Sequence, residues 1–306
     1  MINSLRLYRL HSEWPQSESS LSAQLAQNAF TPCGSFTEQS SGFEPLSNTA
    51  DEMLARRLMG VDWIQMRWQT RVLPNAAVNE ALQERLAEFS QRLRRDATRK
   101  EKRELKDTVY GELLPQALLK SDRILAFYLP RAEVLAVCTS SAKAAELLLD
   151  NLRDALGSLQ VTPFACARPA KGLLKSVFLG KRGGAFQLGN ECRMRDPSDV
   201  RASVAWTDMD LRDASVRKHV NDGLYVDRLG ILYDNALGCV LDEELVLKKL
   251  RFEGLKEVED DGDENPLTRQ DSEYILQAGV IERLVEDIKK SLGGFAAPGE
   301  AARETP

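Results

Sequence analysis

Several features of membrane, secreted and metal proteins are scarce or missing in this chain of 306 residues. The longest apolar runs, such as residues 124–130, stop well short of the roughly 18 residues that cross a bilayer, so no membrane span is predicted. The first residues carry no apolar leader. The five cysteines include no Cys-x-x-Cys pair, so neither a disulfide framework nor a structural zinc site is expected. Together these absences favour a location inside the cell.

The usual catalytic motifs are also absent. Only two histidines are present, His11 and His219, which excludes a three-histidine metal site. Gly180-Lys181 is followed by Arg182 rather than Ser or Thr, so it is no P-loop. There is no Gly-x-Gly-x-x-Gly, Gly-x-Ser-x-Gly or His-Glu-x-x-His, and the acidic run 257–264 lacks the spacing of a calcium loop. The sequence therefore predicts no cofactor, no metal and no enzymatic activity.

What is present is enough apolar surface for a core. Hydrophobic residues make up 43% and charged residues 28% of the chain, a composition typical of folded proteins. Strand patterns occur in closely spaced pairs and do not alternate regularly with helices, which favours an α+β fold with mainly antiparallel sheets and flanking helices. We expect an α+β body formed by residues 1–75 and 121–294, a projecting helical lobe at 76–120, and a disordered tail at 295–306.

The hydrophobic pattern places the individual elements. Strands are predicted at 2–10, 61–73, 124–129, 134–138, 161–166, 185–192, 200–206, 224–233, 239–241 and 245–252, and helices at 20–29, 140–156, 171–179, 212–221 and 280–292. Residues 35–50 and 260–266 are predicted to be loops because they are rich in Ser, Gly, Pro or acidic residues.

The helical lobe carries an unusual basic edge. Its apolar stripe begins at Val78 and disappears between residues 94 and 104, so we expect two helices or one interrupted helix. Helical spacing places five basic residues on one face there, namely Arg92, Arg95, Arg99, Lys102 (or Arg103) and Lys106. Pro115 marks the exit from the lobe.

Charge is distributed unevenly along the chain. The net charge is −5, yet residues 92–106 carry eight basic against three acidic residues, and residues 155–195 carry seven against one. No acidic residue occurs from 155 to 190, a stretch that contains Lys171, Lys175, Lys181 and Arg182. Residues 253–273, in contrast, hold nine acids and two bases. This asymmetry predicts one positive working surface on an otherwise acidic protein, and phosphate backbones are the obvious partner.

Six short segments in order also point to a known family. They are AFTPCG (29–34), LLP (113–115), LGSL (156–159), GAFQLGNEC (184–192), LRFEGL (250–255) and LGG (292–294). With these segments the chain resembles the bacterial recombination-associated RdgC family over nearly its whole length. The resemblance implies a non-enzymatic, nucleoid-associated cytoplasmic protein that binds double-stranded DNA without sequence specificity. It also implies a ring-shaped homodimer with a positive central hole, and restraint of the RecA recombinase.

The resemblance also suggests where the subunits meet. Family members can carry an aromatic residue after Leu-Leu-Pro-x-Ala that engages the second subunit, and this sequence has Leu118 there, so Leu118 and Leu114 are the candidate contacts. Some members carry a basic residue and an amide before an Asp-Leu pair. This chain has Asp208-Met209 instead, so no DNA contact is assigned there. Two alternatives remain open at this point, a metal-dependent DNA-processing enzyme and an adaptor that binds acidic proteins.

Overall fold

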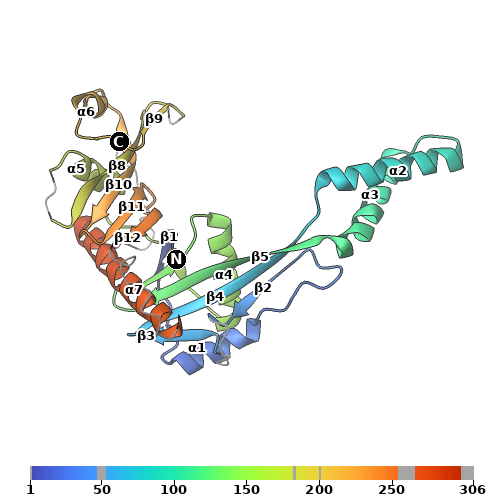
Figure 1. The fold of residues 1–306 in the computed structure, drawn as a ribbon, viewed down its shortest axis with the longest axis horizontal. Coiled ribbons are helices and arrows are strands. Elements are labelled where there is room, and N and C mark those ends of the chain that lie inside the picture. The colour runs from blue at the N-terminus through green and yellow to red at the C-terminus, as the bar shows by residue number, and fades with distance from the viewer. Residues whose placement is uncertain (1, 47–52, 182–183, 200, 254–265, 298–306) are drawn as a thin grey trace.

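The fold is organised around one long antiparallel sheet (Figure 1). The computed structural model describes residues 2–46, 53–181, 184–199, 201–253 and 266–297. In spatial order the sheet runs β2 (Gln39–Glu44), β4 (Val61–Val72), β5 (Leu118–Leu129), β6 (Val134–Val137), β1 (Ser4–Leu10), β12 (Leu247–Phe252), β11 (Leu237–Asp242), β10 (Tyr225–Tyr233), β8 (Phe186–Arg195) and β9 (Ser203–Trp206). Two short strands lie off this path, β3 (Ala55–Leu58) beside β4 and β7 (Val161–Pro163) beside β1. The predicted α+β class with mainly antiparallel strands is confirmed.

Strand β1 joins the two halves of the sheet. It pairs with β6 on one side and with β12 on the other, so the two ends of the sequence meet at its centre. Successive side chains of β1 point to opposite faces of the sheet, and both faces are buried. Leu5 and Leu7 enter one hydrophobic cluster, whereas Tyr8 and Leu10 enter the other.

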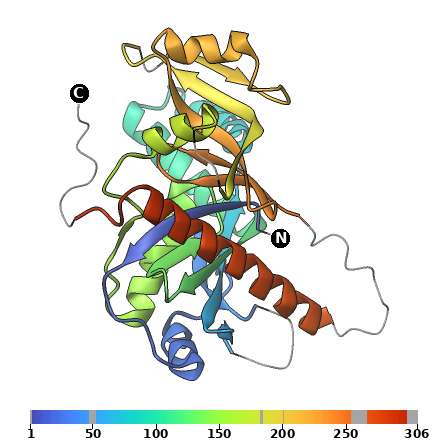
Figure 2. The same cartoon turned by 90° about the vertical axis from the view of Figure 1, so that its left-hand side faces the viewer.

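Helices cover both faces of this sheet (Figure 2). The long helix α7 (Pro266–Ser291) crosses one face, and α1 (Glu18–Leu25) and α4 (Ala142–Leu156) pack on the other. Two shorter helices, α5 (Ala170–Phe178) and α6 (Ala214–Asn221), bury their apolar sides beside the β8–β12 half. Among the described residues, no helix combines the length and hydrophobicity that crossing a membrane requires.

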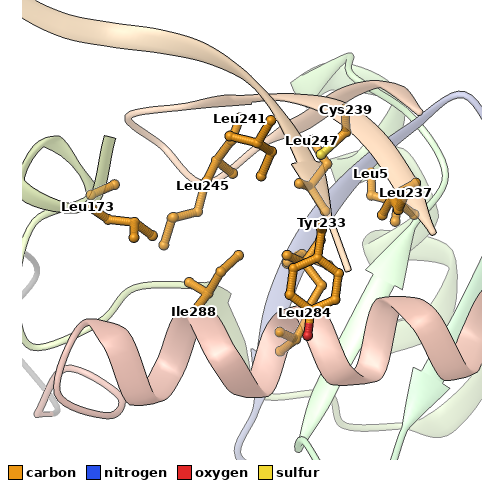
Figure 3. Packing of buried hydrophobic residues seen from close by; sticks show 14 of the residues in the cluster. Leu5, Leu173, Tyr233, Leu237, Cys239, Leu241, Leu245, Leu247, Leu284 and Ile288 are labelled. Atoms are coloured by element: carbon orange, nitrogen blue, oxygen red, sulfur yellow. The ribbon is translucent and has the colours of Figure 1, made fainter. Parts of the chain in front are cut away.

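The contact between α7 and the sheet is largely apolar (Figure 3). Leu284 and Ile288 of α7 are fully buried, and they face Leu245 and Leu247 of the sheet half above. The hydroxyl of buried Tyr233 donates a hydrogen bond to the Asp287 carboxylate of α7 at 2.7 Å, so this polar group is not left without a partner. At the other end of the helix Tyr274 stacks on Trp63 of β4, with ring centroids 4.3 Å apart. The helix therefore fastens the two halves of the sheet to each other.

Two projections give the chain a curved outline. Strands β4 and β5 extend beyond the body and carry the hairpin of α2 (Asn75–Leu93) and α3 (Arg99–Leu113), as Figure 1 shows. At the opposite end β8, β9 and α6 project toward the same side of the molecule. The chain is thus concave between these two projections.

Several elements differ from the sequence-based expectation. Strand β2 lies within the predicted loop 35–50, and β3 was not predicted. Residues 39–44 are rich in Ser, Gln and Gly, and form a strand because their backbone pairs with β4 and Phe43 is buried. Helix α7 begins 14 residues before the predicted residue 280, since its polar first half still packs Tyr274 and Ala278 on the sheet. The predicted acidic loop lies almost wholly outside the described residues.

The expected tail is ordered at its beginning. Phe295 pairs its backbone with Cys166, and its ring meets Phe164 edge-on. The charged groups of Arg9 and Lys289 lie over the same ring, at 4.1 and 4.4 Å from its centroid. Residue 295 therefore belongs to the packed body rather than to a tail, and residues 298–306 lie outside the described part.

A buried carboxylate stabilises the β8–β10 pair and yields a stability prediction. Asp227 is fully buried, Arg193 hydrogen-bonds to it at 3.0 Å, and Arg195 approaches within 2.7 Å. Asp227→Ala leaves two partly buried guanidinium groups without a counter-charge, so we expect a loss of about 3 kcal/mol in the free energy of unfolding. Urea unfolding measures this loss. The exposed pair of Asp150 and Arg153 provides the control, and Asp150→Ala should cost less than about 1 kcal/mol. Equal losses in the two variants would contradict the prediction.

Candidate nucleic-acid interface

The hairpin is built from two separate helices whose ends are set by local sequence. Helix α2 stops at Arg94, whose φ of 51° lies in the left-handed region. Helix α3 starts at Thr98, which forms a capping box with Glu101. The expectation of one basic face running through the whole segment is therefore wrong. Arg92 lies in the last turn of α2, and Arg95 lies in the connection.

Arg95 closes the connection between the helices. Its guanidinium pairs with the Glu101 carboxylate at 2.6 Å and lies over the Phe89 ring, 5.4 Å from the centroid. Because the Glu101 carboxylate neutralises this guanidinium, Arg95 contributes less free positive charge than the sequence suggested.

The remaining basic residues form a continuous face on α3. Arg99, Lys102, Arg103 and Lys106 are all exposed, and three- and four-residue spacing places them on the same side of the helix. Among the described residues none of the four forms an ion pair. Two acidic residues of α3 pair with other residues: Glu104 lies 3.9 Å from Lys100, and Glu112 pairs with Arg85 at 2.9 Å. We call these four residues the α3 basic face.

The capping carboxylate predicts an acid-sensitive hairpin tip. Hydrogen bonds from Arg95 and from the backbone and hydroxyl of Thr98 lower the pKa of Glu101 from an ordinary 4.5 to about 2. Because the pKa is lowered, the ionised Glu101 carboxylate stabilises the folded hairpin fully above pH 4.5. This stabilisation is lost as the pH falls through about 2. We expect the amide signals of Thr98 and Glu101 in NMR spectra to shift in that window. Glu101→Gln should abolish this titration, and a midpoint near pH 4.5 in the unaltered protein would contradict the assignment.

Residues 155–190 contain no acidic residue, but acidic side chains from other parts of the chain lie beside some of their basic residues. The Lys171 ammonium lies 3.3 Å from Glu243 and 4.3 Å from the centre of the Tyr225 ring. Arg193 and Arg195 are directed at buried Asp227. The fold therefore supplies acidic partners from β10 and from the turn before β12, and the positive charge counted along the sequence overstates the charge of the surface.

Two of the predicted residues in this stretch stay exposed. Lys175 lies in the last turn of α5 and Lys181 follows that helix, and both are exposed without an ion pair within the described chain. Arg182 lies outside the described residues. Helix α5 and the hairpin stand at opposite ends of the molecule (Figure 1), so one chain does not bring the two predicted basic groups together.

The two candidate subunit contacts have different environments. Leu118, the first residue of β5, is 80% exposed, and its cross-strand neighbour Val72 is 46% exposed. Leu118 and Val72 therefore form an apolar patch at the base of the hairpin, whereas Leu119, which is 45% exposed, points to the opposite face of the strand pair. Leu114 is buried within the chain at 5% exposure, so its side chain is not presented to a partner here. Leu118 remains the candidate.

The His, Cys, Asp and Glu side chains of the described ranges bear on metal binding and on thiol reactivity. No group of three or more His, Cys, Asp and Glu side chains in these ranges could hold a metal ion. Burial raises the pKa of the Cys166 thiol to about 11 and those of Cys192 and Cys239 to about 12, which keeps them protonated and unreactive near neutral pH. His219 packs beside Trp206, with ring centroids 5.2 Å apart.

Sequence reasoning missed Arg71 on β4. Its guanidinium donates to backbone carbonyls of Gly34 and of Leu114, which belong to two different segments beside the hairpin base. The available signal was the alternation of polar side chains along β4, where Gln65, Arg67, Gln69 and Arg71 share one face.

Comparison with known proteins agrees with the six sequence motifs. The model of the RdgC family, described as "Putative exonuclease, RdgC", matches residues 1–295. Similar proteins from Pseudomonas aeruginosa, Pseudomonas putida and Pseudomonas syringae pathovar tomato are each named "Recombination-associated protein RdgC". They are 31, 30 and 30% identical over 298 residues, which cover 96% of this chain and 97% of each relative.

The two descriptions differ in what they say about activity. The family description names a nuclease, whereas the relatives' names specify only an association with recombination. Neither one shows an enzymatic activity. The resemblance predicted from the six sequence segments is confirmed, since both the family model and the relatives cover nearly the whole chain. This chain belongs to the RdgC family.

Proposed function

We propose that this chain takes part in recombination as a sequence-nonspecific binder of double-stranded DNA. The observation that carries the proposal is the α3 basic face, where four exposed Lys and Arg side chains without acidic partners in the described chain project from the body. Such a surface neutralises phosphates and releases condensed counterions, which drives binding to any DNA sequence. The recombination-associated name of the relatives supports the same conclusion.

The active form in this proposal is a ring of two identical chains around the duplex. Each chain is concave between the hairpin and the β8–β9 projection (Figure 1), so two copies can enclose a hole. A closed twofold ring needs two separate contacts, each self-complementary. The apolar patch of Val72 and Leu118 at the hairpin base supplies one of them. Pairing two chains also places the α3 basic face and Lys175 with Lys181 around a common opening.

Restraint of RecA follows from occupancy of the DNA. A ring that surrounds the duplex and neutralises its phosphates limits the access of the recombinase to that length of DNA. This role places the protein on chromosomal DNA, in association with the nucleoid.

Binding and mass measurements on one sample test the proposal. Linear and circular duplexes of unrelated sequence are titrated at several salt concentrations, and the mass of the protein is measured in solution. We expect a dimer, equal affinity for all sequences, a steep salt dependence and slower release from circular than from linear DNA. Absence of binding to any duplex would instead favour an adaptor that binds acidic proteins, and base-specific affinity would contradict nonspecific binding.

The nuclease named by the family description is tested on the same DNA. Duplexes with free ends and closed circles are incubated with the protein and Mg²⁺ or Mn²⁺, with a metal chelator as the control. Under the proposal both substrates stay intact. Shortening of the linear duplex alone, abolished by the chelator, would establish an exonuclease.

A further inference from the structure

A short segment of chain lies between the sheet and the base of the helical hairpin. Residues 31–38, which we call the strap, precede β2. The Gln69 side chain accepts a hydrogen bond from the Cys33 amide at 2.9 Å, and the Arg71 amide donates to the Glu38 carbonyl at 2.8 Å. The residue just before the strap approaches β2 closely, because a Cβ on Gly42 would lie 2.6 Å from the backbone of Phe30. The strap is therefore fastened to the sheet along its length.

The guanidinium of Arg71 connects this strap to the hairpin. It donates to the carbonyl of Gly34 in the strap at 2.9 Å. From its other side it reaches the carbonyls of Leu114, Pro115 and Ala117, each at 3.2 Å. These three residues form the short 3-10 turn η2 (Leu114–Gln116) and its end, through which the chain leaves α3 for β5. One planar cation thus binds two segments that lie about 80 residues apart in sequence.

Few other contacts fix the direction of the hairpin. Its buried apolar side chains at the base are Val78, Val109 and Leu114, and none of the three belongs to either main core cluster. Burial and the nearby Glu38 carboxylate raise the pKa of Tyr110 on α3, so these two side chains lie close together and form a second contact between the hairpin and the strap. The remainder of the hairpin projects from the β4–β5 pair (Figure 1). The direction of the hairpin therefore depends on the contacts of Arg71 with the strap and with η2, which we call the joint.

We propose that Arg71 is a positioning residue that sets the angle between the α2–α3 hairpin and the sheet. Through this angle it places the α3 basic face and the apolar patch, and this consequence for DNA rests on the proposed function. An Arg is required because only a forked donor reaches both segments, whereas a Lys ammonium is a single point of charge. Arg71→Lys should therefore fail to replace it although the charge is kept.

The first test measures the angle itself, in the absence of DNA. Nitroxide labels are attached through Lys100→Cys at the hairpin tip and Asp154→Cys on α4, both exposed, while the native cysteines are buried or half-buried. Labelled chain is diluted with unlabelled chain so that distances within one chain dominate. We expect a single narrow distance distribution for the unaltered joint, and loss of that narrow peak in Arg71→Met and in Arg71→Lys.

A matched variant separates position from charge. Arg123 on the next strand pairs with the Glu44 side chain at 2.5 Å and binds no backbone carbonyl in the described chain. Arg123→Met should keep the narrow distribution. If Arg71→Met does not fold, Arg71→Lys, which keeps the charge and the aliphatic stem, carries the test. A narrow peak at the unaltered distance in folded Arg71→Lys overturns the proposal.

The second test links the joint to DNA. Arg71→Lys should bind short duplexes with the affinity and salt slope of the unaltered protein, because the α3 basic face and the net charge are kept. It should dissociate faster from circular DNA, because a hairpin with a variable angle to the sheet closes the ring less often. A broadened distance distribution with unchanged release from circles would support the positioning role and contradict the ring. A narrow distribution with faster release would contradict the positioning role alone.

Discussion

Replacing Arg99, Lys102, Arg103 and Lys106 by Gln should weaken duplex binding strongly and equally for all DNA sequences. The four side chains are exposed on one side of α3 and have no acidic partner in the described chain. The slope of log affinity against log salt is negative, and each phosphate that is no longer neutralised reduces its magnitude by about 0.9. The slope should therefore become shallower by up to about 3.6 per chain. Gln is chosen because it has a helix propensity close to that of Lys and Arg, so α3 is retained.

The control for this variant removes the same charge elsewhere. Lys120, Lys249 and Lys290 are exposed and Arg153 is half-exposed, and all four lie outside the hairpin and approach an acidic side chain. Replacing these four by Gln changes the net charge by the same amount. We expect this control to bind DNA nearly as the unaltered protein does. Equal weakening in the two variants would show that only net charge matters, and an unchanged slope in the first would remove α3 from the interface.

The sequence predicted those parts of the fold that depend on local pattern. The strands with clear alternation, such as β1, β4 and β10, lie within a residue or two of their predicted ends. The interruption of the apolar stripe after Leu93 correctly indicated two helices, and Gly157 ends α4 with a φ of 73° as expected of a helix-terminating glycine. These features leave a signature in the pattern of neighbouring residues, and therefore the sequence alone reveals them.

The parts that could not be predicted depend on distant partners. Strand β2 has a polar, Ser-rich sequence, and it is a strand because β4 lies beside it. The first half of α7 has little apolar periodicity, and it is held through Tyr274 on Trp63. The charge count failed in the same way, because Glu243 in the turn before β12 lies near Lys171, and Asp227 on β10 pairs with Arg193 and Arg195. Pairing across the sheet is invisible to a count along the chain.

The same limit applies to the candidate site. One basic helical face was expected to include Arg92 and Arg95, but the left-handed residue Arg94 ends α2 between them. Leu114 and Leu118 looked equivalent as apolar residues near Pro115. The fold separates them, because Leu114 turns into the small core at the hairpin base whereas Leu118 begins an exposed strand end.

Leu118→Asp should shorten the lifetime of the protein on circular DNA more than any other single substitution at the apolar patch. In the proposed ring this side chain meets the second subunit, and a carboxylate left unpaired in that apolar contact costs about 1–3 kcal/mol. Because a twofold ring has two different contacts, the other one keeps the chains joined. We therefore expect a folded dimer whose ring is open, with unchanged affinity for short duplexes and much faster release from circles.

The control for Leu118→Asp is a second exposed apolar residue far from the hairpin. Met59, in the turn between β3 and β4, is 84% exposed, and its φ of 49° suits Asp. Met59→Asp adds the same charge at a similarly exposed position, so it should leave release from circular DNA unchanged. Equal acceleration by both variants would mean that the added negative charge repels DNA. An unchanged lifetime in Leu118→Asp would show that ring closure depends on another surface, since an 80% exposed side chain is not needed for folding.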